Sequence, residues 1–184
     1  DVEVRNRLRS ELRGVLKTCN ASGLLVTHDP QEALAICDRV AVLRDGDLHQ
    51  CSSPKDLVHK PATPFVGRFV LQQNVLPVDT LGEHWTTPIG RIAKPLMKDM
   101  KFPTDLLFDE QSLTLKLDSK GPALVEAREF LGNYWVFKVS LGNYILRIRQ
   151  PLENSFSIGD RCLVGFISGG IGILFPGSVP CLLG

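Results

Sequence analysis

The stretch SGLLVTHDPQEALAICDRV, residues 22–40, decides how the first part of the chain is interpreted. Its apolar run LLVT ends at His28, and such a short run is typical of a buried strand in a parallel sheet. Asp29 has the chemistry of a helix N-cap, a proline follows it, and Glu32 stands where a capping box needs an acidic residue. The pattern predicts a buried strand followed by a helix that ends near Cys37.

Helices and a hairpin are predicted on both sides of this stretch. Residues 2–20 place apolar side chains at helical spacing, with five basic residues among the other positions. After the stretch, two apolar runs are joined by Asp-Gly at residues 45–46, which strongly indicates a β-hairpin. Ser53 and the proline after it predict a further short helix to about His59. We therefore interpret residues 1–72 as the last part of an α/β domain.

Residues 73–184 differ from the first part of the chain in composition and periodicity. The segment KPATPF, residues 60–65, indicates a connector, and beyond residue 72 glycines and prolines interrupt short apolar runs. Two copies of LGNY, at residues 131–134 and 141–144, indicate turns that lead into strands. Many short strands with such turns predict an all-β barrel or sandwich. The predicted strands are NVLPV, HWTT, LLF, LTLKL, ALVEAREFL, YWVFKVSL, YILRIR, RCLVGF and GILF.

Composition excludes few functions. A formal net charge of +1 is too small to indicate a nucleic-acid or membrane-surface partner. Five scattered cysteines show no metal-binding or disulfide spacing, so we expect reduced thiols in a cytosolic protein. No apolar run approaches the roughly 18 residues that span a bilayer, and no signal peptide is recognisable, so we expect neither membrane insertion nor export.

His28 is the main candidate for function. In open α/β sheets, ligands bind outside the carboxyl ends of the strands, and His28 follows the predicted strand directly. An imidazole at that place, just before a helix, can donate a hydrogen bond to an anion such as a phosphate. A purely structural histidine at a strand end is the alternative, and placement alone does not decide between them.

The run LLVTHDPQEALAICDRVAVLRDGDL resembles the switch-histidine region of ATP-binding-cassette (ABC) importer ATPases, and SSPKDLVHKPATPFVGRFV continues the resemblance. EAREFLGNYWVFKVSLGNYILRIRQ and FSIGDRCLVGFISGGIGILFP resemble the OB-like regulatory domain called TOBE. FVLQQNVLP looks most like ferric-iron importer ATPases, with polyamine importers close behind. The resemblance implies the α/β remnant of a P-loop NTPase domain at residues 1–72 and an all-β OB-like (TOBE) barrel at residues 73–184.

The resemblance also implies roles for two residues and a set of partners. His28 is expected to contact the γ-phosphate of ATP, and Asp1 to end the D-loop that signals across a dimer. The intact parent is expected to bind ATP and Mg²⁺, to form a homodimer and to drive transmembrane permease subunits. A periplasmic binding protein takes part indirectly, and the expected location is cytoplasmic, on the inner face of the cell membrane. The implied function is ATP-driven solute uptake, with ferric iron favoured.

Several motifs of the family are missing from the sequence. It contains no G-x-x-x-x-G-K-[ST] P-loop, glutamine loop, signature motif or catalytic glutamate, and it looks like a fragment that starts just after that glutamate. Phosphoryl transfer needs clustered contacts to phosphate and metal, so we expect this chain alone to bind no cofactor and to hydrolyse no ATP. The competing interpretation is a non-enzymatic OB-like module that binds a small oxyanion or a partner protein.

Overall fold

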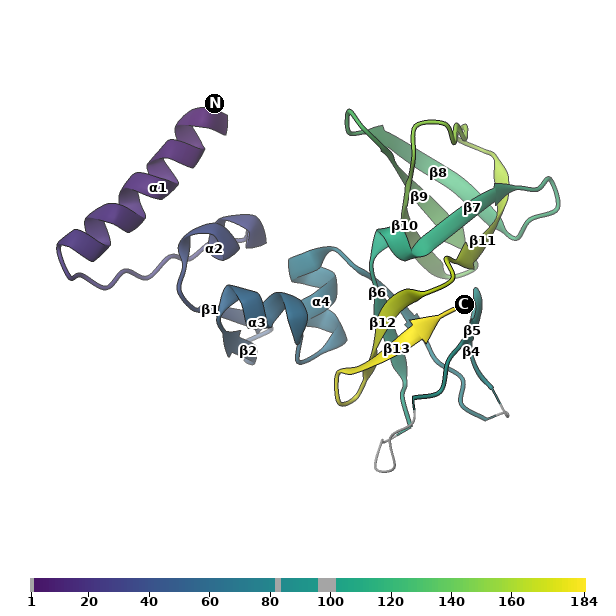
Figure 1. The fold of residues 1–184 in the computed structure, drawn as a ribbon, viewed down its shortest axis with the longest axis horizontal. Coiled ribbons are helices and arrows are strands. Elements are labelled where there is room, and N and C mark those ends of the chain that lie inside the picture. Colours follow the sequence, from purple (N-terminus) through teal and green to yellow (C-terminus); the bar gives the residue numbers. More distant parts are fainter. Residues whose placement is uncertain (1, 82–83, 96–101) are drawn as a thin grey trace. The chain divides into compact units, whose positions relative to one another are not determined.

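The computed structural model describes residues 2–81, 84–95 and 102–184, with only the backbone for residues 2–6 and 8–10. The chain divides into two compact units, Asp1–Leu71 and Gln72–Gly184, and each is described by itself below. The elements of both units are labelled along the ribbon in Figure 1. Among the helices that the structure describes, none combines the length and apolar character needed to cross a membrane.

The first unit contains the helices and the hairpin that the sequence predicts, and one helix that it does not. Ser53 caps a helix as predicted, because its Oγ accepts a hydrogen bond from the Asp56 backbone N–H at 3.1 Å. The hairpin turns at Asp45 and Gly46, both with positive φ, as a tight two-residue turn requires. The elements are α1 Val2–Thr18, α2 Pro30–Ile36, β1 Val40–Arg44, β2 Asp47–Ser52, α3 Pro54–His59 and α4 Pro64–Leu71.

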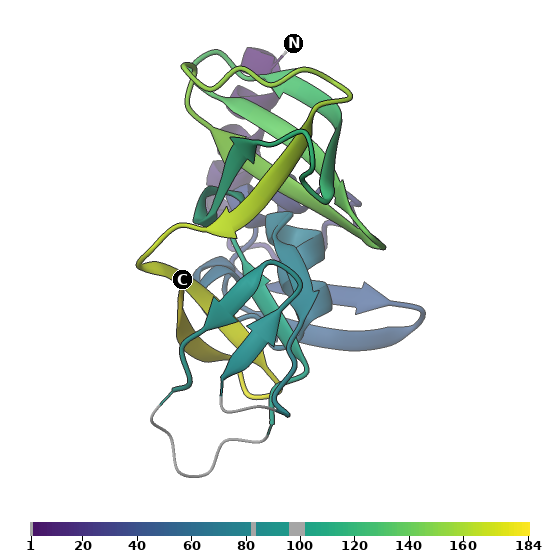
Figure 2. The same cartoon turned by 90° about the vertical axis from the view of Figure 1, so that its right-hand side faces the viewer.

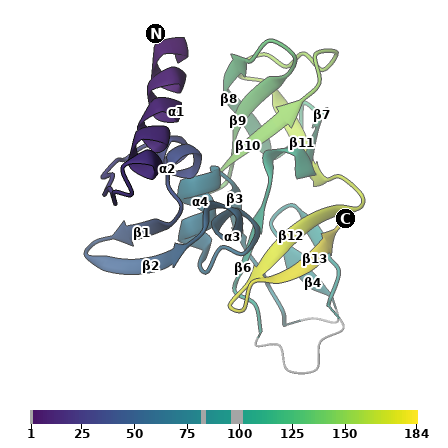
Figure 3. The same ribbon diagram turned by 60° about the vertical axis from the view of Figure 1, so that its left-hand side comes forward.

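The predicted connector at residues 60–65 is in part wrong, since α4 begins inside it. Thr63 Oγ1 accepts a hydrogen bond from the Val66 backbone N–H at 3.3 Å and so caps this helix. The hairpin lies beside α3 and α4 (Figure 3), and side chains from all three bury a small shared core. That core consists of Val42, Leu57, Val66 and Val70.

The predicted strand LLVT is wrong. Residues 21–27 are not a strand, and Leu24 and Val26 are 93% and 87% exposed. A strand needs neighbouring backbone to pair with, and β1 and β2 pair only with each other in a two-stranded sheet. Within the described residues no backbone hydrogen bond reaches residues 22–28. The apolar run therefore stays extended and exposed.

The second unit consists of two antiparallel sheets. One has the strand order β10-β9-β8-β11-β7, and the other β3-β6-β12-β13-β5-β4. All nine predicted runs form strands, whereas β5 and β13 were not predicted. The elements are β3 Asn74–Pro77, β4 Trp85–Thr87, β5 Gly90–Ile92, β6 Asp105–Phe108, η1 Glu110–Ser112, β7 Leu113–Leu117, β8 Ala123–Phe130, β9 Trp135–Leu141, β10 Tyr144–Gln150, β11 Arg161–Phe166, β12 Gly170–Phe175 and β13 Val179–Leu183.

The five-stranded sheet is barrel-like. Its strands curve strongly (Figure 2), and β10 at one edge contacts β7 at the other. The Gly-Asn pairs of both LGNY copies lie in turns, as predicted, and Gly132 and Gly142 adopt the positive φ that these turns need. The unit is thus a mainly β domain with barrel-like sheets, which is compatible with an OB-like fold.

One continuous core and one buried side chain join the two sheets of this unit. Phe137 and Leu146 from one sheet and Leu106 and Leu174 from the other belong to the same buried cluster. The amide of Asn74, at the start of β3, donates to the Arg147 carbonyl oxygen and accepts from the Arg147 N–H, both at 2.8 Å. Asn74 is 5% exposed, so this pair satisfies a buried amide and links β3 to β10.

Candidate functional site

His28 lies between the extended segment and the start of α2, and its side chain is exposed. Neither of its ring nitrogens has a hydrogen-bond partner among the residues that the structure describes. An apolar pocket around the ring would have removed the chemical basis of the predicted role. The ring is instead accessible, so either nitrogen can donate to or accept from an incoming group.

Three hydrogen bonds define the backbone on either side of His28. Thr27 Oγ1 accepts from the Asp29 backbone N–H at 3.0 Å, which closes a short turn around the histidine. The same hydroxyl donates to Glu32 Oε2 at 3.0 Å, and Asp29 Oδ1 accepts from the Gln31 backbone N–H at 2.9 Å. The predicted cap at Asp29 is confirmed, whereas the role of Thr27 was missed. A Ser or Thr two residues before an Asp cap is the signal that could have indicated it.

Asp1, the second predicted site residue, lies outside the described residues. The described parts of the chain contain no group of three or more His, Cys, Asp or Glu side chains placed to hold a metal ion. The donors on the described residues therefore do not fit a Mg²⁺ site, and we derive no step through the metal. The site that the structure brings together is His28 with Thr27, Asp29 and Glu32.

The other histidines differ from His28 in their surroundings. His49 lies in β2, where its ring is 4.9 Å from that of Phe65 and its Nδ1 is 3.3 Å from Thr63 Oγ1. It therefore packs between the hairpin and the start of α4. His59, at the end of α3, and His84 are exposed. His59 thus offers a natural control for His28, because it is an exposed histidine on the same unit.

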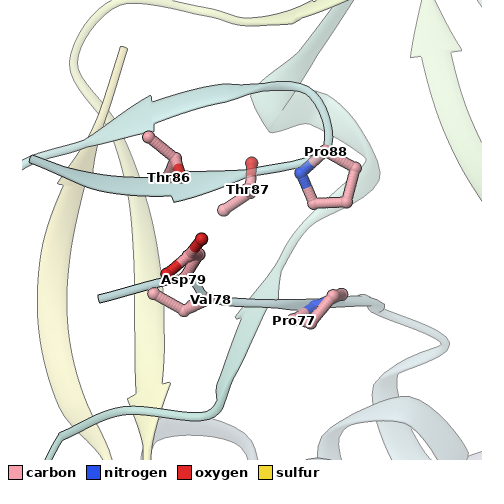
Figure 4. A pocket seen from close by; sticks show the side chains of 6 residues that line it. All are labelled: Pro77, Val78, Asp79, Thr86, Thr87 and Pro88. Atoms are coloured by element: carbon pink, nitrogen blue, oxygen red, sulfur yellow. The ribbon is translucent and has the colours of Figure 1, made fainter. Parts of the chain in front are cut away.

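A hollow of about 320 Å³ lies on the second unit, between β3 and the β4–β5 hairpin (Figure 4). Its lining side chains are Pro77, Val78, Asp79, Thr86, Thr87 and Pro88. Asp79 Oδ1 accepts from the Leu81 N–H at 2.9 Å, and Thr87 Oγ1 donates to the Gly90 carbonyl at 3.0 Å. The lining has a carboxylate and no basic side chain, so this hollow is unsuited to the small oxyanion of the competing interpretation.

Comparison with known proteins identifies relatives along most of the chain. The Fe(3+) ions import ATP-binding protein FbpC of Brucella abortus is 26% identical over 182 residues, which are 95% of this chain and 52% of the relative. The protein of the same name from Streptomyces coelicolor is 34% identical over 134 residues, 73% of this chain and 38% of the relative. The sulfate/thiosulfate import ATP-binding protein CysA 2 of Chromobacterium violaceum is 35% identical over 115 residues, which are 62% of this chain and 29% of the relative. No family model matches the chain.

The chain is therefore a homologue of the ATP-binding subunits of ABC importers, and the resemblance that the sequence indicated is confirmed. Two of these three relatives carry a ferric-iron name and one a sulfate/thiosulfate name. The chain spans about half the length of the Brucella relative and smaller shares of the other two.

Proposed function

We propose that this chain is the part of an ABC importer ATP-binding subunit that senses the terminal phosphate of ATP and carries a regulatory β domain. The observation that carries the proposal is the accessible His28 ring, held beside the cap of α2 in a chain homologous to such subunits. Residues 1–72 belong to a P-loop NTPase domain under this proposal, and residues 73–184 form the OB-like (TOBE) domain. The subunit works as a homodimer beside transmembrane permease subunits, on the cytoplasmic face of the membrane.

The proposed role of His28 follows from its chemistry. An imidazole N–H can donate to a γ-phosphate oxygen, and it loses that partner when the phosphate leaves. The ring therefore distinguishes ATP from ADP, and the same donated hydrogen bond can stabilise the negative charge that develops on the phosphate during hydrolysis. ATP and Mg²⁺ are held by other parts of a longer polypeptide, and Asp1 relays the state of the site to the second copy. This chain alone hydrolyses no ATP, because one histidine supplies too few contacts for phosphoryl transfer.

ATP hydrolysis by the longer polypeptide that carries these residues tests the role of His28. A His28→Ala variant should lower the hydrolysis rate by about 100-fold, the order of magnitude for removing one donor to a developing charge. His59→Ala, on the same unit, should leave the rate unchanged. If the longer polypeptide contains a P-loop and hydrolyses ATP at the same rate with His28 or with Ala at this position, the phosphate-sensing role of His28 is contradicted.

The proposed cargo is ferric iron, supported by the names of the relatives from Brucella and Streptomyces. Uptake of radioactive ferric iron and of radioactive sulfate by cells with and without the gene tests this proposal. We expect loss of iron uptake alone. Loss of sulfate uptake alone would replace iron by the oxyanion as the cargo.

A further inference from the structure

We infer that Thr27, together with Glu32, is a positioning pair that holds His28 in the orientation its phosphate contact needs. This inference rests on the proposed function, because it assigns a role to residues that act through His28. Neither residue of the pair needs to touch a nucleotide. Their effect is to reduce the number of conformations that the histidine can adopt.

The direction of the two hydrogen bonds makes the Thr27 hydroxyl the centre of the arrangement. A carboxylate oxygen can only accept, so at 3.0 Å the Thr27 O–H proton points to Glu32 Oε2. A hydroxyl lone pair is then left for the Asp29 N–H, also at 3.0 Å. Glu32 lies in the first turn of α2, so the Thr27–Glu32 hydrogen bond links the residue before His28 to the helix that follows it.

The segment before His28 shows why these two hydrogen bonds matter for the position of the histidine. Leu24 and Val26 are almost fully exposed, and no backbone hydrogen bond within the described residues holds residues 22–28. Each freely rotating residue adds conformations that binding must remove, at a cost in backbone entropy. Thr27 and Glu32 are both partly buried, so their hydrogen bond restrains the chain where residues 22–28 meet helix α2.

A plain helix cap makes a different prediction from a positioning pair. Loss of a cap lowers the stability of the helix that it starts and leaves a neighbouring exposed side chain as mobile as before. Loss of a positioning pair increases the motion of His28 itself. Ser53 provides a matched control, because its Oγ accepts from the Asp56 N–H at 3.1 Å and donates to Asp56 Oδ2 at 2.7 Å. It caps α3 with the same kind of hydroxyl and carboxylate.

The test is made on the full 184-residue chain by NMR, with the three-bond couplings that report the χ1 rotamer of His28. Thr27→Val, which removes the hydroxyl at nearly constant shape, should move these couplings toward rotamer averaging. It should also speed amide exchange at Asp29 by about three- to tenfold, the effect of losing one hydrogen bond. Glu32→Ala should move the His28 couplings in the same direction, and Thr27→Ser should restore the wild-type values.

Ser53→Ala should speed exchange at Asp56 by a similar factor and leave the His28 couplings unchanged. Wild-type His28 couplings in both Thr27→Val and Glu32→Ala would overturn the inference, as would an equal shift in Ser53→Ala. The proposed function fails separately, if His28→Ala leaves ATP hydrolysis by the longer polypeptide unchanged. The couplings measured on this chain decide the positioning role whatever that hydrolysis result is.

Discussion

Residues 1–71 and residues 72–184 differ in how completely they bury their own apolar side chains. In the second unit, Phe137 and Leu146 are fully buried in one cluster that both sheets share. Among the described side chains of the first unit, four form the buried core, while Leu24 and Val26 remain 93% and 87% exposed. Contiguous exposed apolar residues of this kind mark surfaces that another segment covers. The second unit thus has the larger buried core, and we expect the exposed apolar run of the first unit to contact another segment.

The difference between the units shows that an apolar run becomes a strand only where another segment lies beside it to pair with. In the second unit each predicted apolar run finds an antiparallel neighbour within the same unit. The LLVT run has the same composition as a buried strand and finds no neighbour among the described residues. Apolar composition favours a strand, but the strand forms only where a neighbouring backbone pairs with it on at least one side.

The largest expected effect is loss of the core of the second unit. Phe137→Ala should lower its free energy of unfolding by about 3–5 kcal/mol, since it removes a fully buried aromatic ring and leaves a cavity. Urea unfolding followed by β-sheet circular dichroism measures the change. Leu163→Ala, on β11 of the same sheet and 43% exposed, is the control and should cost much less. Similar losses for the two variants would contradict a shared, tightly packed core.

One glycine in each unit sharpens the comparison. A Cβ at Gly121 would overlap the Cys162 carbonyl group, so Gly121→Ala should destabilise the second unit by about 1–3 kcal/mol or more. A Cβ at Gly14, inside α1, meets nothing within 4 Å, so Gly14→Ala should stabilise that helix by about 1 kcal/mol. Thermal unfolding of both variants measures the two shifts. Shifts of the same sign would show that α1 does not behave as an exposed helix.

The buried thiols give the second unit a dependence on pH. Burial raises the pKa of the Cys181 thiol from 9.0 to about 11, although a hydrogen bond from the Gly172 backbone partly opposes the rise. The folded state therefore keeps the proton that the unfolded state loses, so the free energy of unfolding should fall as pH rises from about 9 to 11. Urea unfolding at several pH values measures the slope.

Two cysteine variants separate the contributions to this slope. Cys181→Ala should reduce it, whereas Cys19→Ala, at an exposed position, should leave it unchanged. Burial also raises the pKa of the Cys162 thiol, so part of the slope should survive in Cys181→Ala. A slope that is identical in wild type and Cys181→Ala would contradict the assignment.

The smallest expected effect on stability comes from the exposed segment of the first unit. Leu24→Ser and Val26→Ser should change the free energy of unfolding by no more than about 0.5 kcal/mol, because neither side chain is buried. Self-association should nevertheless decrease, since the exposed apolar surface is what drives it. Sedimentation velocity at several concentrations measures this. A wild-type chain that is monomeric at every concentration would contradict self-association through the exposed Leu24 and Val26 side chains.

Most of the secondary structure could be predicted from local patterns. The caps at Asp29 and Ser53 and the Asp-Gly turn depend on neighbouring residues alone, so the sequence specifies them. Strands β5 and β13 were missed, although β3, which contains Pro77, and the three-residue β4 were predicted, so neither a proline nor a short length alone decides whether a run forms a strand. The false strand at LLVT failed because pairing is a property of distant residues.

The candidate site was predictable only as a position. His28 could be singled out by its place between an apolar run and a helix cap, and by resemblance to a family. Its exposure and the Thr27–Glu32 hydrogen bond could not be read from spacing, because they depend on how the chain before α2 runs. Side-chain partners five residues apart across a turn have no sequence signature as clear as a capping box.

Residue-resolved hydrogen exchange on the intact chain tests the central claim, that residues 72–184 form a larger and more stable buried core than residues 1–71. The amides of β8, β9 and β10 should exchange at least about 100-fold more slowly than those of β1 and β2, because exchange protection follows local stability. Equal protection in the hairpin and in the three strands would contradict the account, since residues 1–71 would then be as stable without a partner as the β domain is.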